Sequence, residues 1–123
     1  MLLQNFNYSE YILFVYLCVA NADNQLTSPE IDVLFDKMDL KGFEDSGKNE
    51  LMVSVVYKKY KSLSYEQRLL AIKEAAPFHL KEKQKGLKLL QNLNQIIKAD
   101  NVISIEEQNM FSQIEMIINE MES

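Results

Sequence analysis

Residues that break helices or cross-link a chain are scarce in this sequence. Its 123 residues include three glycines, two prolines, one cysteine, one histidine and no tryptophan. A single thiol allows no intrachain disulfide and no cysteine-based zinc site, and the lone His79, which we expect in a loop, has no second imidazole for a histidine metal site. None of the familiar nucleophile, zincin, redox or phosphate-loop motifs occurs. We therefore predict an all-α protein without enzymatic activity.

Long apolar runs are missing too, with one exception. The stretch from Tyr11 to Ala20 is ten apolar residues, and an Ala-Asn-Ala sequence at its end has the form of a signal-peptide cleavage site. However, the preceding residues contain no Lys or Arg, Glu10 adjoins the run, and a membrane-spanning helix needs about 20 residues. We therefore expect no transmembrane segment, a cytoplasmic location, and a central first helix that buries this run together with Cys18.

Charge is distributed unevenly along the chain. Residues 1–45 carry eight acidic residues and two lysines, residues 46–98 carry 11 basic residues and four glutamates, and residues 99–123 carry six acidic residues and no basic one. The stretch 81–88 is the most basic, with four lysines. It is either a solvated helix face or a surface that meets the acidic face of a second copy, which would make a homo-oligomer. Its interleaved Glu and Gln, and the net charge of −5, argue against nucleic acid.

A nine-residue pattern occurs twice. It spans residues 22–30 and, 77 positions later, residues 99–107, and both copies read Ala-Asp-Asn, any residue, an aliphatic, a hydroxyl residue, two more residues and Glu. Asn24 and Asn101 suit the left-handed backbone that often follows a helix, and the hydroxyl residue with Glu three positions later forms a capping box for the next helix. Each copy is thus a corner between two helices. We predict one domain, residues 1–123, with two pseudo-symmetric helix–corner–helix units.

Capping signals and apolar periodicity predict about six or seven helices. Capping boxes at Asn7 and Ser64 mark two of the starts, and Pro77 is expected to end the fourth helix at Ala76. The predicted helices span about 8–22, 28–40, 48–61, 65–76, 81–99 and 105–120. Among the side chains that these patterns direct toward the core are Val55, Leu70 and Leu87.

The aspartates of the two corners, Asp23 and Asp100, are harder to explain by local structure. An acidic residue at the C-terminal end of a helix faces the negative end of the helix dipole, and this cost occurs twice. A structural explanation is that each Asp braces its turn. A functional explanation is that the corners approach each other and form an oxygen cluster for a hard divalent cation, Mg²⁺, Ca²⁺ or Mn²⁺. The four carboxylates of this predicted cluster are Asp23, Glu30, Asp100 and Glu107.

The two corners resemble those of the TerB-like tellurite-resistance family, to which the N-terminal domain of the DjlA co-chaperones is related. The resemblance is carried by the pattern Ala-Asp-(Gly/Asn)-x-(Leu/Ile)-(Ser/Thr)-x-x-Glu near both ends of an acidic helical domain, with Asn24 and Asn101 in place of the usual Gly. It implies a helical bundle with two similar halves and acidic positions that match the four carboxylates. It also implies a bacterial stress-response role through metal binding and scaffolding of protein complexes.

Three functions are consistent with these patterns. The leading expectation is a non-enzymatic, TerB-like cytoplasmic domain that binds protein partners and holds a divalent cation in the carboxylate cluster. The alternatives are a metal-dependent hydrolase that uses the same carboxylates to hold a catalytic ion, and a helical module with no ligand. Both metal hypotheses require the two corners to lie close together, and the hydrolase also requires a pocket beside them.

Overall fold

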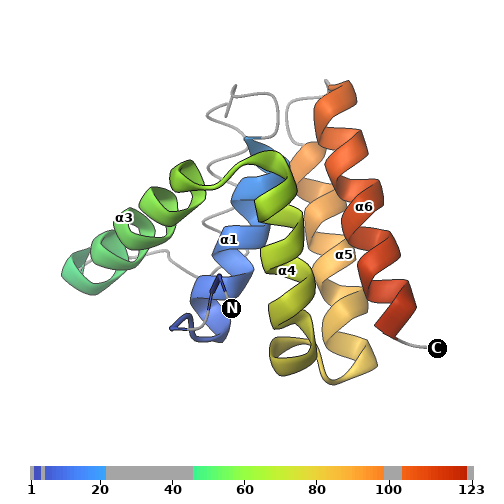
Figure 1. The fold of residues 1–123 in the computed structure, drawn as a ribbon, viewed down its shortest axis with the longest axis horizontal. Coiled ribbons are helices and arrows are strands. Elements are labelled where there is room, and N and C mark those ends of the chain that lie inside the picture. Colours follow the sequence, from blue (N-terminus) through green and yellow to red (C-terminus); the bar gives the residue numbers. More distant parts are fainter. Residues whose placement is uncertain (1, 4, 22–45, 99–103, 122–123) are drawn as a thin grey trace.

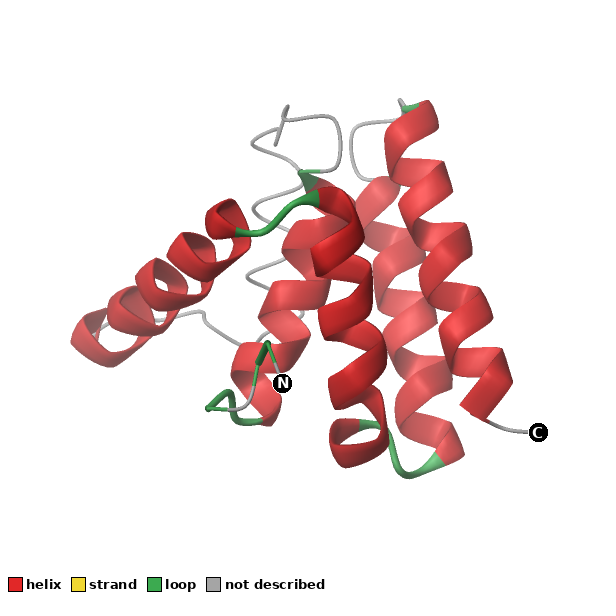
Figure 2. Cartoon of the chain, in the orientation of Figure 1, coloured by secondary structure: helices red, strands yellow, loops and turns green. Residues whose placement is uncertain are grey.

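The computed structural model describes residues 2–3, 5–21, 46–98 and 104–121. Every regular element in these ranges is an α-helix and none is a strand, which confirms the all-α prediction (Figure 2). The helix predicted over 28–40 lies outside the described residues. The helices are α1 (Tyr8–Ala20), α3 (Ser46–Ser62), α4 (Tyr65–His79), α5 (Lys83–Ile97) and α6 (Ile105–Met121).

Helix α1 is the centre of the core, as predicted. It starts at a capping box in which the Asn7 side chain accepts from the Glu10 backbone N–H at 2.9 Å and the Glu10 carboxylate accepts from the Asn7 N–H at 2.8 Å. From Tyr11 to Ala20 every residue is buried. A helix that is apolar on all sides is stable only when other elements cover it. The other four described helices all pack against α1, which lies near the middle of the molecule (Figure 1).

Tyrosine side chains join α1 to the helices around it. The buried Tyr11 hydroxyl donates to the Ile72 carbonyl of α4 at 3.0 Å, and the Tyr60 hydroxyl of α3 donates to the Asn21 carbonyl just after α1 at 3.0 Å. Arg68 of α4 lies with its guanidinium 3.7 Å from the centroid of the Tyr60 ring, and its Nε donates to the Tyr60 carbonyl. These bonds satisfy the polar ends of large side chains that are otherwise apolar. They fix how α3 and α4 sit on α1.

The remaining helices form two groups around α1. Helix α6 packs against α4 and α5, whereas α3 lies at the other side of α1, at an angle to the rest (Figure 1). None of the helices in the described part of the chain is long and apolar enough to cross a membrane.

Pro77 does not end α4, contrary to the prediction. The helix continues through it to His79, and the Leu80 N–H donates to the Ala76 carbonyl at 2.8 Å to close the last turn. Proline removes one N–H and crowds the carbonyl four residues earlier, but tertiary contacts hold this turn in place. Leu80 is buried in the core, and the His79 ring stacks on that of Tyr11 with centroids 4.7 Å apart.

The predicted inward direction is wrong for three apolar side chains. Val55, Leu70 and Leu87 are 43%, 50% and 45% exposed. In α5 the buried line instead consists of Gly86, Leu89, Leu93, Ile96 and Ile97. When two adjacent residues are both apolar, the sequence does not show which of them faces the core, and the two directions differ by about 100° around the helix axis. The helices that pack against the segment determine which side is buried.

Gly86 allows α5 to approach α6 closely. A Cβ atom added at Gly86 would lie 2.9 Å from the Ile118 Cγ2 atom of α6, which is itself buried. Alanine improves helix propensity by about 0.5–1 kcal/mol over glycine, but forcing a methyl group into a packed interface costs about 1–3 kcal/mol. We therefore expect Gly86→Ala to lower the free energy of unfolding by about 1 kcal/mol in urea denaturation.

A double-mutant cycle tests the cause of that loss. Ile118→Ala removes the atom that the new methyl group meets, so the destabilisation in Gly86→Ala/Ile118→Ala should be smaller than the sum of the two single effects. A stabilised Gly86→Ala protein would contradict the close approach.

Candidate functional site

Of the four predicted metal-binding carboxylates, the structure describes Glu107. Asp23, Glu30 and Asp100 lie outside the described residues, as do the turns of both corners. In the described part of the chain, no three His, Cys, Asp or Glu side chains are grouped closely enough to hold an ion.

Glu107 forms the capping box predicted for the last helix. The Ser104 Oγ atom accepts from the Glu107 backbone N–H at 3.0 Å and donates to Glu107 Oε1 at 3.1 Å. The Ser104 backbone N–H also approaches Oε1, at 3.5 Å. Glu107 is only 2% exposed, which is unusual for a carboxylate. The cap therefore places an acidic side chain inside the protein at the start of α6.

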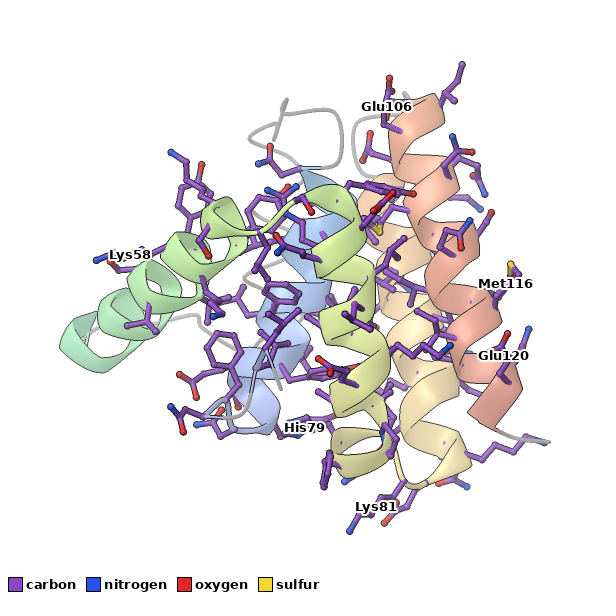
Figure 3. The ribbon with its side chains drawn as sticks, in the orientation of Figure 1. Lys58, His79, Lys81, Glu106, Met116 and Glu120 are labelled. Carbon is purple, nitrogen blue, oxygen red and sulfur yellow. The ribbon has the colours of Figure 1, made fainter. Side chains whose placement is uncertain are left out.

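The described segments that flank the two corners meet at one end of the bundle. Helices α1 and α5 both finish at the end where α6 begins, and Glu106 marks this end in Figure 3. Lys81 and His79 lie at the opposite end (Figure 3). The acidic start of α6 and the basic start of α5 are thus separated by the length of the bundle.

A surface pocket of about 380 Å³ lies between α1 and α5, and extends from their first turns at the basic end to Tyr16 and Asn92. This volume is within the range of small-molecule sites. The lining combines apolar, hydroxyl, amide and charged side chains from these two helices. They are Tyr8, Ser9, Ile12, Tyr16, Glu82, Gln84, Lys85, Lys88, Leu89 and Asn92. We call this cavity the α1–α5 pocket.

The α1–α5 pocket has a positive edge. The Lys85 Nζ atom lies 5.1 Å from the centroid of the Tyr8 ring, within the range of a cation–π contact. Lys88, one turn further along α5, also lines the pocket, and Glu82 is the one acidic residue of the lining. Burial, and then the nearby charge of Lys85, lower the pKa of His79 below its usual value. Each of these effects disfavours the protonated imidazole.

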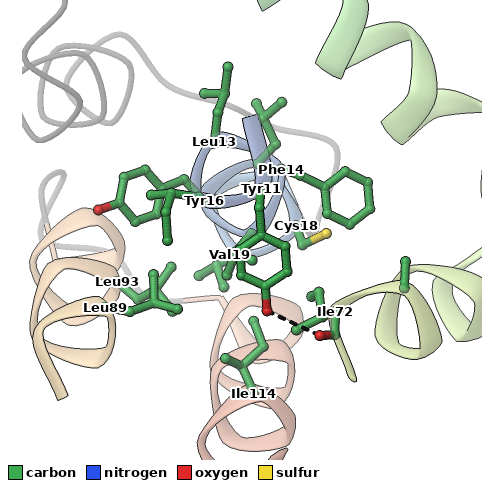
Figure 4. Close-up of a cluster of buried hydrophobic side chains, with 14 of the residues drawn as sticks. Tyr11, Leu13, Phe14, Tyr16, Cys18, Val19, Ile72, Leu89, Leu93 and Ile114 are labelled. Atoms are coloured by element: carbon green, nitrogen blue, oxygen red, sulfur yellow. Dashed lines mark hydrogen bonds between the residues drawn. The ribbon is translucent and has the colours of Figure 1, made fainter. Parts of the chain in front are cut away.

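A second polar feature lies deeper in the α1–α5 pocket. Tyr16 of α1 is 2% exposed, and its hydroxyl accepts a hydrogen bond from Asn92 Nδ2 of α5 at 3.0 Å. Figure 4 shows this hydroxyl directed toward α5. Burial raises the pKa of Tyr16, although the bond from Asn92 opposes that shift. The phenol therefore remains protonated at neutral pH and keeps a hydrogen that it can donate.

A larger groove of about 610 Å³ lies between the N-terminal segment and α3. Its lining includes Leu2, Phe6 and Val55, with Lys58 and Lys59 also contributing. Figure 3 shows Lys58 on the side of α3 that points away from the other helices.

The remaining candidate residues have structural positions. Cys18 is buried, as predicted, and burial raises the pKa of its thiol. His79 is the last residue of α4 and not a loop residue, because its stacking on Tyr11 keeps the final turn of the helix in place. The pocket residues Tyr8, Tyr16 and Asn92 were missed from the sequence. The available signal was the hydroxyl groups within the apolar run, since a buried tyrosine hydroxyl usually has a hydrogen-bond partner.

Comparison of the chain with protein-family models, with curated proteins and with solved structures finds no match in any of the three. The resemblance to the TerB-like family therefore rests on the two repeated corners.

Proposed function

We propose that this chain is a TerB-like, non-enzymatic helical domain that binds partner proteins and holds a divalent cation between its two corners. The ligands would be Asp23, Glu30, Asp100 and Glu107. The observation that carries this proposal is the meeting of α1, α5 and the start of α6 at one end of the bundle, with the buried Glu107 at that end. In this proposal the segment 28–40 supplies a further helix and completes the first of two similar halves.

The arrangement of the flanking helices supports a shared site. Each corner follows a helix of the core, the first after α1 and the second after α5, and these two helices contact each other and end at the same side. Carboxylate oxygens are the ligands that Mg²⁺, Ca²⁺ and Mn²⁺ prefer. A cation would also offset the unfavourable position of Asp23 and Asp100 next to the negative ends of two helix dipoles.

The segregated charge supports binding of a partner protein. Helix α6 contains four glutamates and no basic residue, whereas the segment from α3 to α5 carries the excess of lysine. Opposite potentials at separate surfaces orient an approaching charged protein. A cytoplasmic stress-response role belongs to the same proposal and derives from the family resemblance.

Calorimetric titration with Ca²⁺, Mg²⁺ and Mn²⁺ tests the cation site. We expect saturable binding of at least one ion and a higher melting temperature, because a ligand present at 100 times its dissociation constant stabilises the native state by about 2.7 kcal/mol. Both effects should be lost in Asp23→Asn/Asp100→Asn. Glu107→Gln keeps an acceptor oxygen for Ser104 but removes the charge, so it should lower the affinity for the ion at least about tenfold.

The matched control is Glu106→Gln, which makes the same change at the exposed neighbouring position. It should leave the affinity for the ion nearly unchanged. The absence of both heat and a shift in melting temperature with all three ions would reject the cation site.

A further inference from the structure

The first turn of α5 lacks the side-chain cap that is present at the starts of α1 and α4. Asn7 and Ser64 accept from backbone N–H groups through their side chains, whereas Glu82, the N-cap of α5, makes no side-chain cap. The Glu82 carbonyl accepts from the N–H groups of Lys85 and Gly86, so the N–H groups of Lys83 and Gln84 at the very start of the helix have no side-chain cap. Free N–H groups at a helix start, together with the dipole, attract anions.

Independent evidence for a ligand comes from the Tyr16 hydroxyl. Tyr16 is nearly fully buried and lines the α1–α5 pocket, and its oxygen already accepts from Asn92. A phenol also has one hydrogen to donate, and the bond from Asn92 uses the oxygen as an acceptor and leaves that hydrogen for another partner. Buried donors in native proteins usually have an acceptor. An acceptor atom bound in the pocket would complete the bonding of this hydroxyl.

The walls of the α1–α5 pocket suit a flat apolar body. Ile12 and Leu89 are largely buried, so the pocket has an aliphatic floor, while the Tyr8 ring is exposed enough to stack against a ligand. Lys85 lies over Tyr8, so a cation and an aromatic face occupy the same edge. Lys88 adds a second positive charge, and Glu82 offsets one of the two. The pocket thus combines an excess of positive charge with apolar surface.

We propose that the α1–α5 pocket binds a small organic phosphomonoester with a flat, apolar body. Lys85 and Lys88 pair with the phosphate, the Tyr16 hydroxyl donates to one of its oxygens, and the body lies against Tyr8 and Ile12. Phosphate suits this set of donors better than carboxylate does, because it has three terminal oxygens and a charge near −2 at neutral pH. This site goes beyond the proposed cation site and lies at the opposite end of the bundle.

Titration followed by amide NMR shifts tests the proposal with four probes at pH 7.5 in 0.1 M salt. The probes are phenyl phosphate, inorganic phosphate, benzoate and benzamide. We expect phenyl phosphate to bind at least about tenfold more tightly than inorganic phosphate, which lacks the ring, and than benzoate, which lacks the phosphate. Benzamide, which has no charge, should not bind. The largest shifts should fall in residues 8–16 and 82–92. Absence of saturable shifts with phenyl phosphate, or equal affinity for benzoate, would overturn the proposal.

Two double variants separate the pocket from a general basic surface. Lys85→Ala/Lys88→Ala should weaken phenyl phosphate at least about tenfold. Lys81→Ala/Lys83→Ala removes the same charge from the same stretch, at positions that do not line the pocket, and should weaken it less than about threefold because exposed charges are screened at this salt concentration. Equal losses in the two double variants would show a general basic surface and overturn the site.

Tyr16→Phe examines the buried donor while keeping the ring. We expect it to weaken the binding of phenyl phosphate at least about tenfold, the loss of one hydrogen bond to a charged group, with an unchanged far-ultraviolet circular dichroism spectrum. Unchanged affinity would remove the hydroxyl from the site. The Asp23→Asn/Asp100→Asn protein should bind phenyl phosphate normally, so failure of the cation site and failure of this site are distinguishable.

Discussion

Replacing Phe14 with alanine should lower the free energy of unfolding by about 3–5 kcal/mol, a large part of the roughly 5–15 kcal/mol that stabilises a domain. Phe14 is fully buried in α1, and its ring makes edge-to-face contacts with Phe6 and with Tyr60, both with centroids 6.3 Å apart. Figure 4 shows its ring on the opposite side of α1 from Tyr16. The truncation leaves a cavity where the N-terminal segment, α1 and α3 meet. Urea denaturation followed by circular dichroism measures the change.

Phe78→Ala is the matched control for this substitution. Phe78 lies near the end of α4 and is 62% exposed, so the same truncation removes little buried surface. Its effect should stay within about 0.5 kcal/mol. Equal effects at Phe14 and Phe78 would contradict the central position of α1.

Cys18 should react with a thiol-specific disulfide reagent at least about a thousandfold more slowly in the native protein than in the unfolded chain. The side chain is 1% exposed, and burial raises the pKa of the thiol, so both access and the reactive thiolate are suppressed. Reaction then requires opening of the core, and an opening free energy of about 4 kcal/mol or more corresponds to this factor. The release of the chromophore, followed over time at pH 8, measures the rate.

The denatured protein provides the control for the thiol measurement. In 6–8 M urea one thiol per chain should react at the rate of a free cysteine. When opening is global, Phe14→Ala should speed the native reaction about tenfold for each 1.4 kcal/mol of stability that it removes. Rapid modification of the native wild-type protein, with an unchanged circular dichroism spectrum, would show that Cys18 is accessible.

The starts of helices could be predicted because their signals are local. The boxes at Asn7, Ser64 and Ser104 each depend on residues three positions apart, and all three form as predicted. The burial of α1 could also be predicted, because a run without polar residues has no side that favours water. These features depend on short-range chemistry alone.

The predictions that were wrong concern features that depend on contacts between distant segments of the chain. Pro77 was expected to end α4, but the Tyr11 ring, 66 positions earlier, stacks on His79 and holds the last turn. Leu87 was expected in the core, but the close approach of α6 at Gly86 turns the buried line of α5 away from it. Neither effect can be predicted from the local sequence, because both depend on how the helices pack against each other.

The candidate sites show the same division. The capping role of Glu107 followed from its spacing to Ser104, whereas the proposed cluster with Asp23, Glu30 and Asp100 stays a prediction. The α1–α5 pocket could not be predicted, because Tyr16 and Asn92, which it brings together, are 76 positions apart. The lysines of the pocket belong to the stretch 81–88, which stands out in the sequence as the most basic. The tyrosines of the pocket lie far earlier in the chain, in α1.

The complete burial of α1 has a consequence for biosynthesis. Its partners follow it along the chain, and α6 begins 85 residues after α1 ends. At a translation rate of about 5–20 residues per second, roughly 4–17 s therefore pass after α1 is made before synthesis of α6, its last described partner, begins. During that time α3, α4 and α5 are made, but the side of α1 that packs against α6 stays uncovered. This apolar surface is therefore available to a chaperone at the ribosome.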